Sequence, residues 1–264
     1  MSLRVLITND DGVDAPGIAV MQEIARALTD DIWVVAPDGN QSGAAHRFTF
    51  GRELRLEQRG PQTYAVHGGS PADCVVAGMT HLCGERLPDV VLSGVNNGQN
   101  LGDIINCSGT AAGAREGTLQ GALGIALSQA VDYERGHDVI WDNARRFGAE
   151  LVRGILAESS TVSGERRETY FNVNFPHCAP DEVTGIRVVA SQRFSRSPMR
   201  YYQGDNPGNF FISIPETPTP LDRAHDFHIL HHENAITVTP LSLQQSDLVT
   251  AARLNGKLLL NGRG

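Results

Sequence analysis

The sequence predicts an α/β fold built on a doubly wound, mostly parallel sheet. In the first half of the 264-residue chain, short β-rich runs alternate with stretches of helical spacing. Several of these runs are apolar without polar alternation, as expected for parallel strands that helices cover on both faces. Polar, glycine-bearing segments follow several of the runs, as turns at a sheet edge do. These three features together favour the doubly wound class.

Five apolar or β-branched runs are the predicted strands of the first half, at residues 3–8, 32–36, 64–67, 90–93 and 125–128. Three helices are predicted between them. In the first, apolar residues recur at helical spacing (Ile18, Met21, Ala25 and Leu28). The second begins at Ser70, an N-cap that is followed by a proline at the first helical position and an aspartate two residues later. The third, over residues 108–123, is rich in alanine and glycine, which permits close packing on a sheet.

The second half follows a different pattern. Residues 137–159 predict one long amphipathic helix with an inner apolar stripe (Val139, Ala144, Phe147, Leu151 and Ile155). A polar loop is expected at 159–168, and further strands at 170–175, 185–191, 210–214 and 235–239. Residues 193–209 carry proline, glycine and many polar residues, so they predict an excursion or hairpin. We expect one α/β domain over 1–264, with an elaborated, β-rich C-terminal third.

The composition limits the possible partners. A net charge of −8 and a pI near 5.6 speak against nucleic acid or an anionic membrane as the main partner. The N-terminus has no signal-peptide pattern, and no run approaches the ~20 apolar residues of a membrane span. The four cysteines form no CxxC pair and are typical of reduced packing residues. These features predict a cytoplasmic protein.

Four polar segments mark the expected site: residues 8–12, 36–43, 93–100 and 107–110. In open α/β sheets, ligands bind beyond the carboxyl ends of the strands. Three of the segments should therefore converge at one edge of the sheet, with the fourth opening a helix beside them.

Oxygen donors in these segments suit a divalent cation. Adjacent carboxylates such as Asp10 and Asp11 repel each other unless a cation or hydrogen-bond donors compensate, although Asn-Asp-Asp-Gly is also ordinary turn chemistry. Ser42 and Asn96, at the ends of neighbouring predicted strands, add two neutral oxygens. Such a set fits Mg²⁺ or Mn²⁺ and leaves positions for water and a phosphate. Since it contains no His or Cys, a zinc site is not expected.

The helix start at Ser108-Gly109-Thr110 offers hydroxyls and backbone N–H groups to a phosphate. A plain N-cap is the alternative. The segment is not a Walker P-loop, because no lysine follows at the required spacing, and no GxGxxG follows the first strand. The histidines near the C-terminus are interpreted as a solvated or packing set (His225, His228, His231 and His232). Arg115 and Glu116, in the third helix, fit an ion pair or surface role as well as a catalytic one.

Six ordered blocks resemble the SurE survival-protein family of 5′/3′-nucleotidases: ITNDDG, APGI, APDGNQSG, GSPADCV, SGVNNGQN and SGTAAGAREG. The blocks span about the first half of the chain. The resemblance implies a Rossmann-like core, one divalent metal cation (Mg²⁺ or Mn²⁺) and hydrolysis of nucleoside monophosphates. It also implies a homodimer or homotetramer formed through the C-terminal extension, here 193–264.

The family's functional residues carry over onto matching positions. Its metal ligands fall on Asp10, Asp11, Ser42 and Asn96, of which the two aspartates are the expected catalytic residues. Its phosphate-binding segment falls on Ser108, Gly109 and Thr110, with Asn100 nearby, and we expect Asn96 to contact the phosphate as well. The chain departs from the family at Ser70, where threonine is usual, and at Cys107, where an aromatic residue often stands.

The predicted function is a metal-dependent phosphatase that hydrolyses nucleoside 5′-monophosphates, with 3′-monophosphates as a further substrate class. A phosphatase for other phosphate esters or polyphosphate is one alternative, and a non-catalytic nucleotide-binding module is another. The Asp10–Asp11 pair favours catalysis, because anion capture would not favour two adjacent negative charges. Direct attack by water and a covalent aspartyl-phosphate both remain open, although the haloacid-dehalogenase type requires Asp-x-Asp, which Asp10-Asp11-Gly12 is not.

Overall fold

The computed structural model describes residues 2–132, 139–159, 167–214, 220–255 and 257. Its centre is a nine-stranded sheet with the order β3-β4-β2-β1-β5-β6-β7-β11-β8. The strands of this sheet are β1 (Arg4–Thr8), β2 (Asp31–Pro37), β3 (Arg55–Gly60), β4 (Thr63–His67), β5 (Val90–Asn97), β6 (Leu123–Gln129), β7 (Thr169–Phe175), β8 (Ile186–Val188) and β11 (Ile236–Ser242). The α-helices are α1 (Pro16–Arg26), α2 (Pro71–Ala77), α3 (Gly109–Leu119), α4 (Asp142–Glu158), α5 (Asp226–His232) and α6 (Leu248–Leu254).

The strand order reverses next to β1. Strands β4, β2, β1, β5, β6 and β7 are parallel, whereas β3 and β11 pair antiparallel to β4 and β7. The chain runs outward from β1 through β2 to β4, and then returns to β5 on the other side of β1. This reversal confirms the doubly wound class, and it creates a topological switch point between β1 and β5, where such folds bind ligands.

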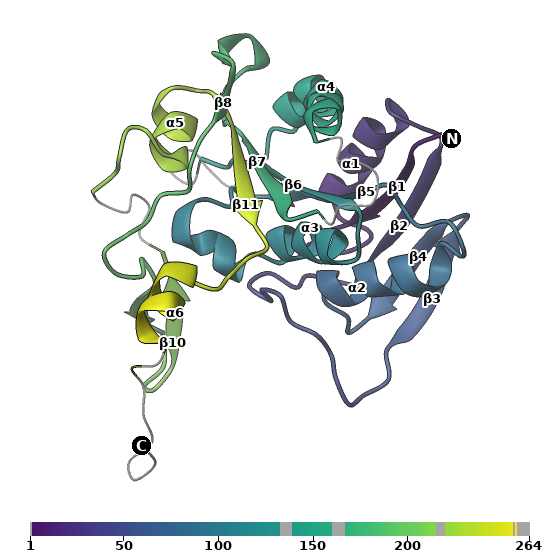
Figure 1. The fold of residues 1–264 in the computed structure, drawn as a ribbon, viewed down its shortest axis with the longest axis horizontal. Coiled ribbons are helices and arrows are strands. Elements are labelled where there is room, and N and C mark those ends of the chain that lie inside the picture. Colours follow the sequence, from purple (N-terminus) through teal and green to yellow (C-terminus); the bar gives the residue numbers. More distant parts are fainter. Residues whose placement is uncertain (1, 133–138, 160–166, 215–219, 256, 258–264) are drawn as a thin grey trace.

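Helices cover both faces of the sheet, α1 and α4 on one side and α2 and α3 on the other (Figure 1). The larger core cluster lies under α1 and α4 and includes Ile18, Met21 and Leu151, which are buried as the helical spacing predicts. The second cluster lies under α2. No helix in the described part of the chain is both long and apolar enough to span a bilayer.

The five strands predicted in the first half are confirmed to within a few residues. The capped start of α2 is also confirmed, because Ser70 accepts from the Asp73 backbone N–H while the Asp73 carboxylate accepts from the Ser70 backbone N–H. Strand β3 was not predicted, since its sequence RLEQRG is charged and the strand lies at the edge of the sheet with most of its residues exposed.

Two predicted helix bounds are wrong. Helix α3 ends at Leu119 rather than at 123, because Gly121 turns the chain at a φ of +99° and Leu123 already begins β6. Helix α4 begins at Asp142. Val139, expected on its inner stripe, therefore precedes the helix, and residues 137–138 lie outside the described residues.

The C-terminal third contains the predicted hairpin and two helices that were not predicted. Strands β9 (Arg200–Gln203) and β10 (Phe210–Ser213) form a separate antiparallel pair. Helix α5 is held at its start by the buried carboxylate of Asp226, which accepts from the backbone N–H groups of Gly102 and Gln192 at 2.7 and 2.8 Å. This anchor is tertiary, so the local sequence gives little sign of it. The predicted loop at 159–168 falls largely outside the described residues.

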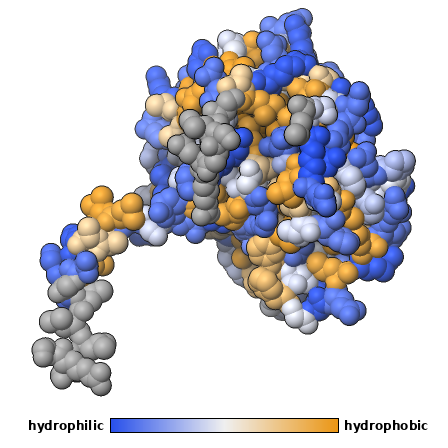
Figure 2. All heavy atoms as spheres, turned by 45° about the vertical axis from the view of Figure 1, so that its right-hand side comes forward, coloured by the Kyte–Doolittle hydropathy of each residue, from blue (hydrophilic) through white to orange (hydrophobic). Residues whose placement is uncertain are grey.

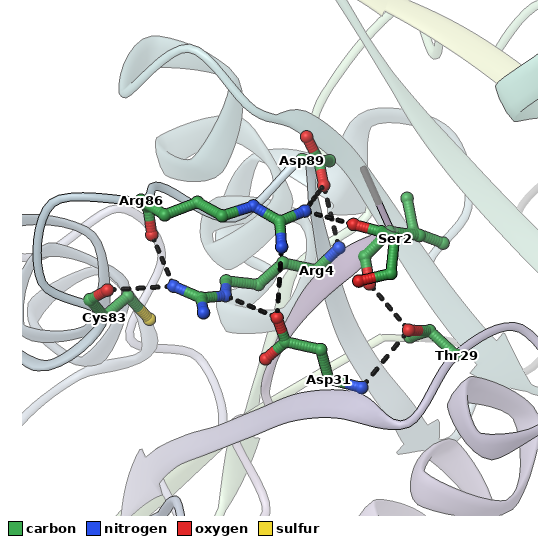
Figure 3. A network of polar contacts seen from close by, with 8 residues as sticks. Ser2, Arg4, Thr29, Asp31, Cys83, Arg86 and Asp89 are labelled. Carbon is green, nitrogen blue, oxygen red and sulfur yellow. Dashed lines mark hydrogen bonds and ion pairs between the residues drawn. The ribbon is translucent and has the colours of Figure 1, made fainter.

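A polar network connects the chain segments at the N-terminal end of β1 (Figure 3). The Arg4 guanidinium donates to Asp31 at 2.8 Å and to the backbone carbonyls of Cys83 and Arg86. Asp89 accepts from the Arg4 backbone N–H at 2.7 Å. The network ties the starts of β1 and β2 to the segment before β5. It therefore lies at the N-terminal ends of these strands, whereas the polar segments with Asp10 and Asn96 lie at the C-terminal ends.

Candidate functional site

The predicted metal-binding segments meet at the switch point. Asp10 and Asp11 lie two and three residues after the end of β1, and Asn96 lies near the end of the adjacent strand β5. The Asn97 backbone N–H donates to Asp11 Oδ2 at 3.2 Å, which joins the ends of the two strands. The Gln41 backbone N–H donates to the Asp10 carbonyl at 2.6 Å, so the loop that carries Ser42 is fastened beside the aspartates. The Ser42 side chain itself is exposed.

Strand β5 is irregular next to Asn96. The pairing of β5 with β6 shifts register between Gly94 and Asn96, as at a β-bulge, a feature that is frequent next to active sites because it re-aims a side chain. The Asn96 amide nitrogen donates to the Gly98 carbonyl at 2.7 Å. Since this bond uses the nitrogen, Oδ1 is the atom of Asn96 that could contact a cation.

Asp10 is buried against the start of α3. The Thr110 hydroxyl donates to Asp10 Oδ1 at 2.7 Å. Gly109 permits this approach, because a Cβ there would lie 2.7 Å from Asp10 Cβ and 2.8 Å from Oδ2. Burial raises the pKa of Asp10, and the bonds from Thr110 and the N–H groups at the helix start oppose that rise. The positive end of α3 therefore faces the carboxylate of Asp10.

Asp11 has less compensation. Burial raises its pKa to about 6, the charge of Asp10 adds to the rise, and the Asn97 N–H opposes it. Within the described ranges, neither aspartate has a basic ion-pair partner. Two close carboxylates without a cationic partner, flanked by the Asn96 and Ser42 segments, have the chemistry of a hard divalent-cation site. The same part of the chain contains no group of three or more His, Cys, Asp or Glu placed to hold a metal, so a cation here would depend on amide, hydroxyl, phosphate or water oxygens.

Asn100 lies beneath this site rather than on its surface. It is buried, and its amide nitrogen donates to the Ser128 hydroxyl at 2.9 Å and lies 3.4 Å from the Thr110 hydroxyl. Its backbone carbonyl accepts from the side chains of Asn172 and Asn174 in β7. This buried asparagine pair was not predicted, although its spacing of two in a strand could have indicated a shared face.

Ser108 has the N-cap role that the sequence left as an alternative. Its hydroxyl accepts from the Ala111 backbone N–H at 3.0 Å. In this structure the carboxylate of Asp10 faces the N-terminus of α3, where a phosphate was expected. A phosphate would therefore share this electropositive end with Asp10, and the roles of Ser108, Gly109 and Thr110 in phosphate binding stay a prediction.

Two of the four C-terminal histidines lie close to acidic groups. His225 Nδ1 lies 3.3 Å from Asp222, His228 Nε2 lies 4.0 Å from Glu233, and the rings of His228 and His232 are in contact. These contacts agree with the packing interpretation.

The fold and the geometry define a doubly wound α/β protein with an acidic, oxygen-donor site at its switch point. The profile of the family "Survival protein SurE" matches residues 5–197. The chain belongs to the SurE family.

Relatives and a solved structure resemble nearly the whole chain. A protein named 5′-nucleotidase SurE from Bradyrhizobium diazoefficiens is 42% identical over 97% of this chain and 100% of its own length. Its namesake from Methylobacterium radiotolerans is also 42% identical, over 95% and 97% of the two chains. The crystal structure of the SurE protein from Aquifex aeolicus superposes with a TM-score of 0.81 at 30% identity, and the match covers 96% of this chain and 98% of that one.

Proposed function

We propose that the protein is a metal-dependent 5′-nucleotidase that hydrolyses nucleoside monophosphates, with activity on 3′-monophosphates as well. The observation that carries the proposal is the uncompensated carboxylate pair Asp10–Asp11 at the switch point, beside the start of α3. The names of the relatives at about 40% identity support the reaction class.

The residues at the site have different proposed roles, which follow from their positions. Asp10, Asp11, Asn96 and Ser42 would hold one Mg²⁺ or Mn²⁺, which when bound would offset the charge that builds on the transferring phosphoryl group. Thr110 orients Asp10 through its hydroxyl, while the backbone amides at the start of α3 supply positive potential to the phosphate oxygens. One of the two aspartates would accept the proton of the attacking water.

The test is phosphate release by the purified full chain from a substrate panel. The panel contains AMP, 3′-AMP, polyphosphate and p-nitrophenyl phosphate, each with Mg²⁺, with Mn²⁺ or with a chelator. We expect metal-dependent turnover of AMP, and its loss by at least about 100-fold in the variants D10N and D11N. D30N is the matched control, because Asp30 is exposed and precedes β2 at the other end of the sheet.

The other functions give different patterns. Preferential turnover of polyphosphate would replace the nucleotide assignment, and saturable AMP binding without phosphate release would replace catalysis. If D11N retains wild-type turnover in chelator-treated buffer, the metal mechanism is wrong.

The C-terminal segment 193–264 is proposed to carry contacts between copies of this chain. An isolated two-stranded hairpin is at best marginally stable in water, yet β9–β10 exposes Tyr201, Phe210, Phe211 and Ile212. Figure 2 shows hydrophobic side chains on an arm that projects from the body, at the end of the molecule where Figure 1 places this hairpin and α6. We expect light scattering to give a dimer or tetramer, and the variant F211S to shift it toward monomer.

A further inference from the structure

A cavity of about 510 Å³ lies beside α3 and touches the candidate site at Ser108. Its walls come from the loop after β2, the 3₁₀ segment Gly102–Cys107, α3 and the residues around the end of β11. Most of its lining is polar, and the polar side chains include His46, Asn106, Arg115, Tyr170, Ser191 and Gln244. Such a lining suits a charged or hydroxylated group better than an apolar one.

Arg115 brings a positive charge to this cavity. Arg115 Nη1 lies 2.6 Å from His46 Nδ1, and His46 Nε2 lies 2.9 Å from Glu116 Oε2. Because a guanidinium can only donate, Nδ1 must be the acceptor, and the ring proton on Nε2 is donated to Glu116. His46 is therefore a neutral bridge, and the buried carboxylate of Glu116 contacts His46 and Gln120 instead of Arg115.

The positive charge of the Arg115 guanidinium is available to bind an anion. Among the described residues no acidic side chain forms an ion pair with Arg115. The cavity does contain one carboxylate, Asp103, but both of its oxygens are engaged: Oδ1 pairs with Arg193 Nε at 2.8 Å, and Oδ2 accepts from the Phe194 backbone N–H at 2.9 Å. In a chain with a net charge of −8, this cavity has a local cationic excess.

Arg115 lies on the same cavity as Ser108, at the helix start where a phosphate is expected. Ser108, Ala111, Ala112 and Arg115 all line the cavity, and they follow one side of α3 from its N-terminus. Arg115 lies six residues beyond Gly109, which is about 9 Å along the helix axis. Helical side chains lean toward the N-terminus of their helix, which favours a position of the guanidinium toward the Asp10 end of α3. An anion there would lie on the side of α3 that Ser108 also lines, next to Gly109, which packs against Asp10.

We propose that Arg115, positioned by His46, forms a subsite for a second phosphate of the substrate, so that nucleoside 3′,5′-bisphosphates are preferred over monophosphates. The inference rests on the proposed function. One phosphate is hydrolysed at Asp10 and Asp11 while the other binds Arg115. Water oxygen forms the new bond to phosphorus, the ester P–O bond breaks, and a proton passes to the nucleoside oxygen. The products are inorganic phosphate and a nucleoside monophosphate.

The test compares kcat/KM for AMP and for adenosine 3′,5′-bisphosphate in the wild type, R115Q and R115K. Charge-assisted contacts to phosphate are among the strong hydrogen bonds. We therefore expect the wild type to prefer the bisphosphate by about tenfold or more. R115Q should lose this preference through KM while AMP turnover is unchanged, and R115K should retain part of it. R26Q is the matched control, since Arg26 is exposed at the end of α1 and bonds to Gln22.

The outcomes separate the two proposals. If the wild type hydrolyses AMP but shows no preference for the bisphosphate, or if R115Q lowers both values equally, the subsite is overturned while the nucleotidase stands. If the wild type hydrolyses no phosphomonoester with Mg²⁺ or Mn²⁺, both proposals fail. Should R115Q not fold, the wild-type preference and its weakening at high salt decide the question, because a contact between Arg115 and a phosphate is screened by salt.

Discussion

Replacing Asp11 by asparagine is expected to stabilise the metal-free protein while abolishing turnover. Asparagine keeps the shape of the side chain and an oxygen that can accept from the Asn97 N–H, but it removes the negative charge. That charge is costly in the folded state, because burial and the neighbouring charge of Asp10 raise the pKa of Asp11 from 3.8 to about 6.

The size of the effect follows from that pKa. A rise from 3.8 to about 6 would correspond to about 3 kcal/mol for a fully buried group. Asp11 is half-buried, so solvent screening reduces the expected gain to about 1–2 kcal/mol. For a chain of this length that is roughly 2–8 °C in Tm.

The pH dependence has a definite sign. Folded Asp11 binds its proton more tightly than unfolded Asp11 does, so its cost is absent below about pH 4, grows between pH 4 and 6, and is complete above 6. D11N should therefore exceed the wild type in stability at pH 8 but not at pH 4. The measurement is denaturant unfolding with a chelator at both values, repeated with excess Mn²⁺. Added Mn²⁺ should stabilise the wild type and reverse the order at pH 8.

Two results would refute this reasoning. One is a chelated D11N that is no more stable than the wild type at pH 8. The other is a gain that is the same at pH 4 and pH 8, because an effect independent of protonation cannot come from the charge of Asp11.

Three further predictions concern the same site and its support. G109A should push Asp10 out of place, lowering turnover by at least about tenfold and stability by about 1–3 kcal/mol, whereas G154A, with open space around its Cβ position, should be neutral or slightly stabilising by unfolding assays. The apparent affinity for Mn²⁺, measured by calorimetry, should fall as the pH drops below about 6, since protons then compete for Asp11; an affinity that is flat from pH 5 to 8 would contradict it. R4M should cost about 1–3 kcal/mol of stability while kcat stays unchanged, because the polar network of Arg4 lies at the N-terminal ends of the strands and the candidate site lies at their C-terminal ends.

The sequence predicted those parts of the fold that have a strong local signal. Strands β1, β5 and β6 are almost continuously buried apolar runs, so their composition reveals them. Strand β3 and helix α5 carry little such signal. The first is charged and exposed at an edge, and the second depends on the contacts of Asp226 with backbone groups far away in the chain.

The candidate site was predictable to the level of segments, not of contacts. Polar turns after apolar strands indicated which loops matter, and the strand order then brings the β1 and β5 ends together. That Asp10 faces the start of α3 depends on the lack of a side chain at Gly109 and on the Thr110 hydroxyl, a three-dimensional fit. His46 was missed for the same reason, because its partners are about 70 residues away in the chain.

The two adjacent aspartates illustrate how one residue type acquires two roles from its surroundings. Asp10 is buried, but a hydroxyl and the positive end of α3 face its carboxylate, so its negative charge has stabilising partners within the chain. Asp11 has one backbone N–H and the repulsion of its neighbour, which leaves its charge to be balanced by something outside the chain. We infer that Asp10 is the anchored ligand and Asp11 the responsive one, which releases a proton when the cation binds. Because Asp11 is about half-protonated near pH 6, a titration there should show about half a proton released from it per Mn²⁺ bound in the wild type, and a smaller release in D11N.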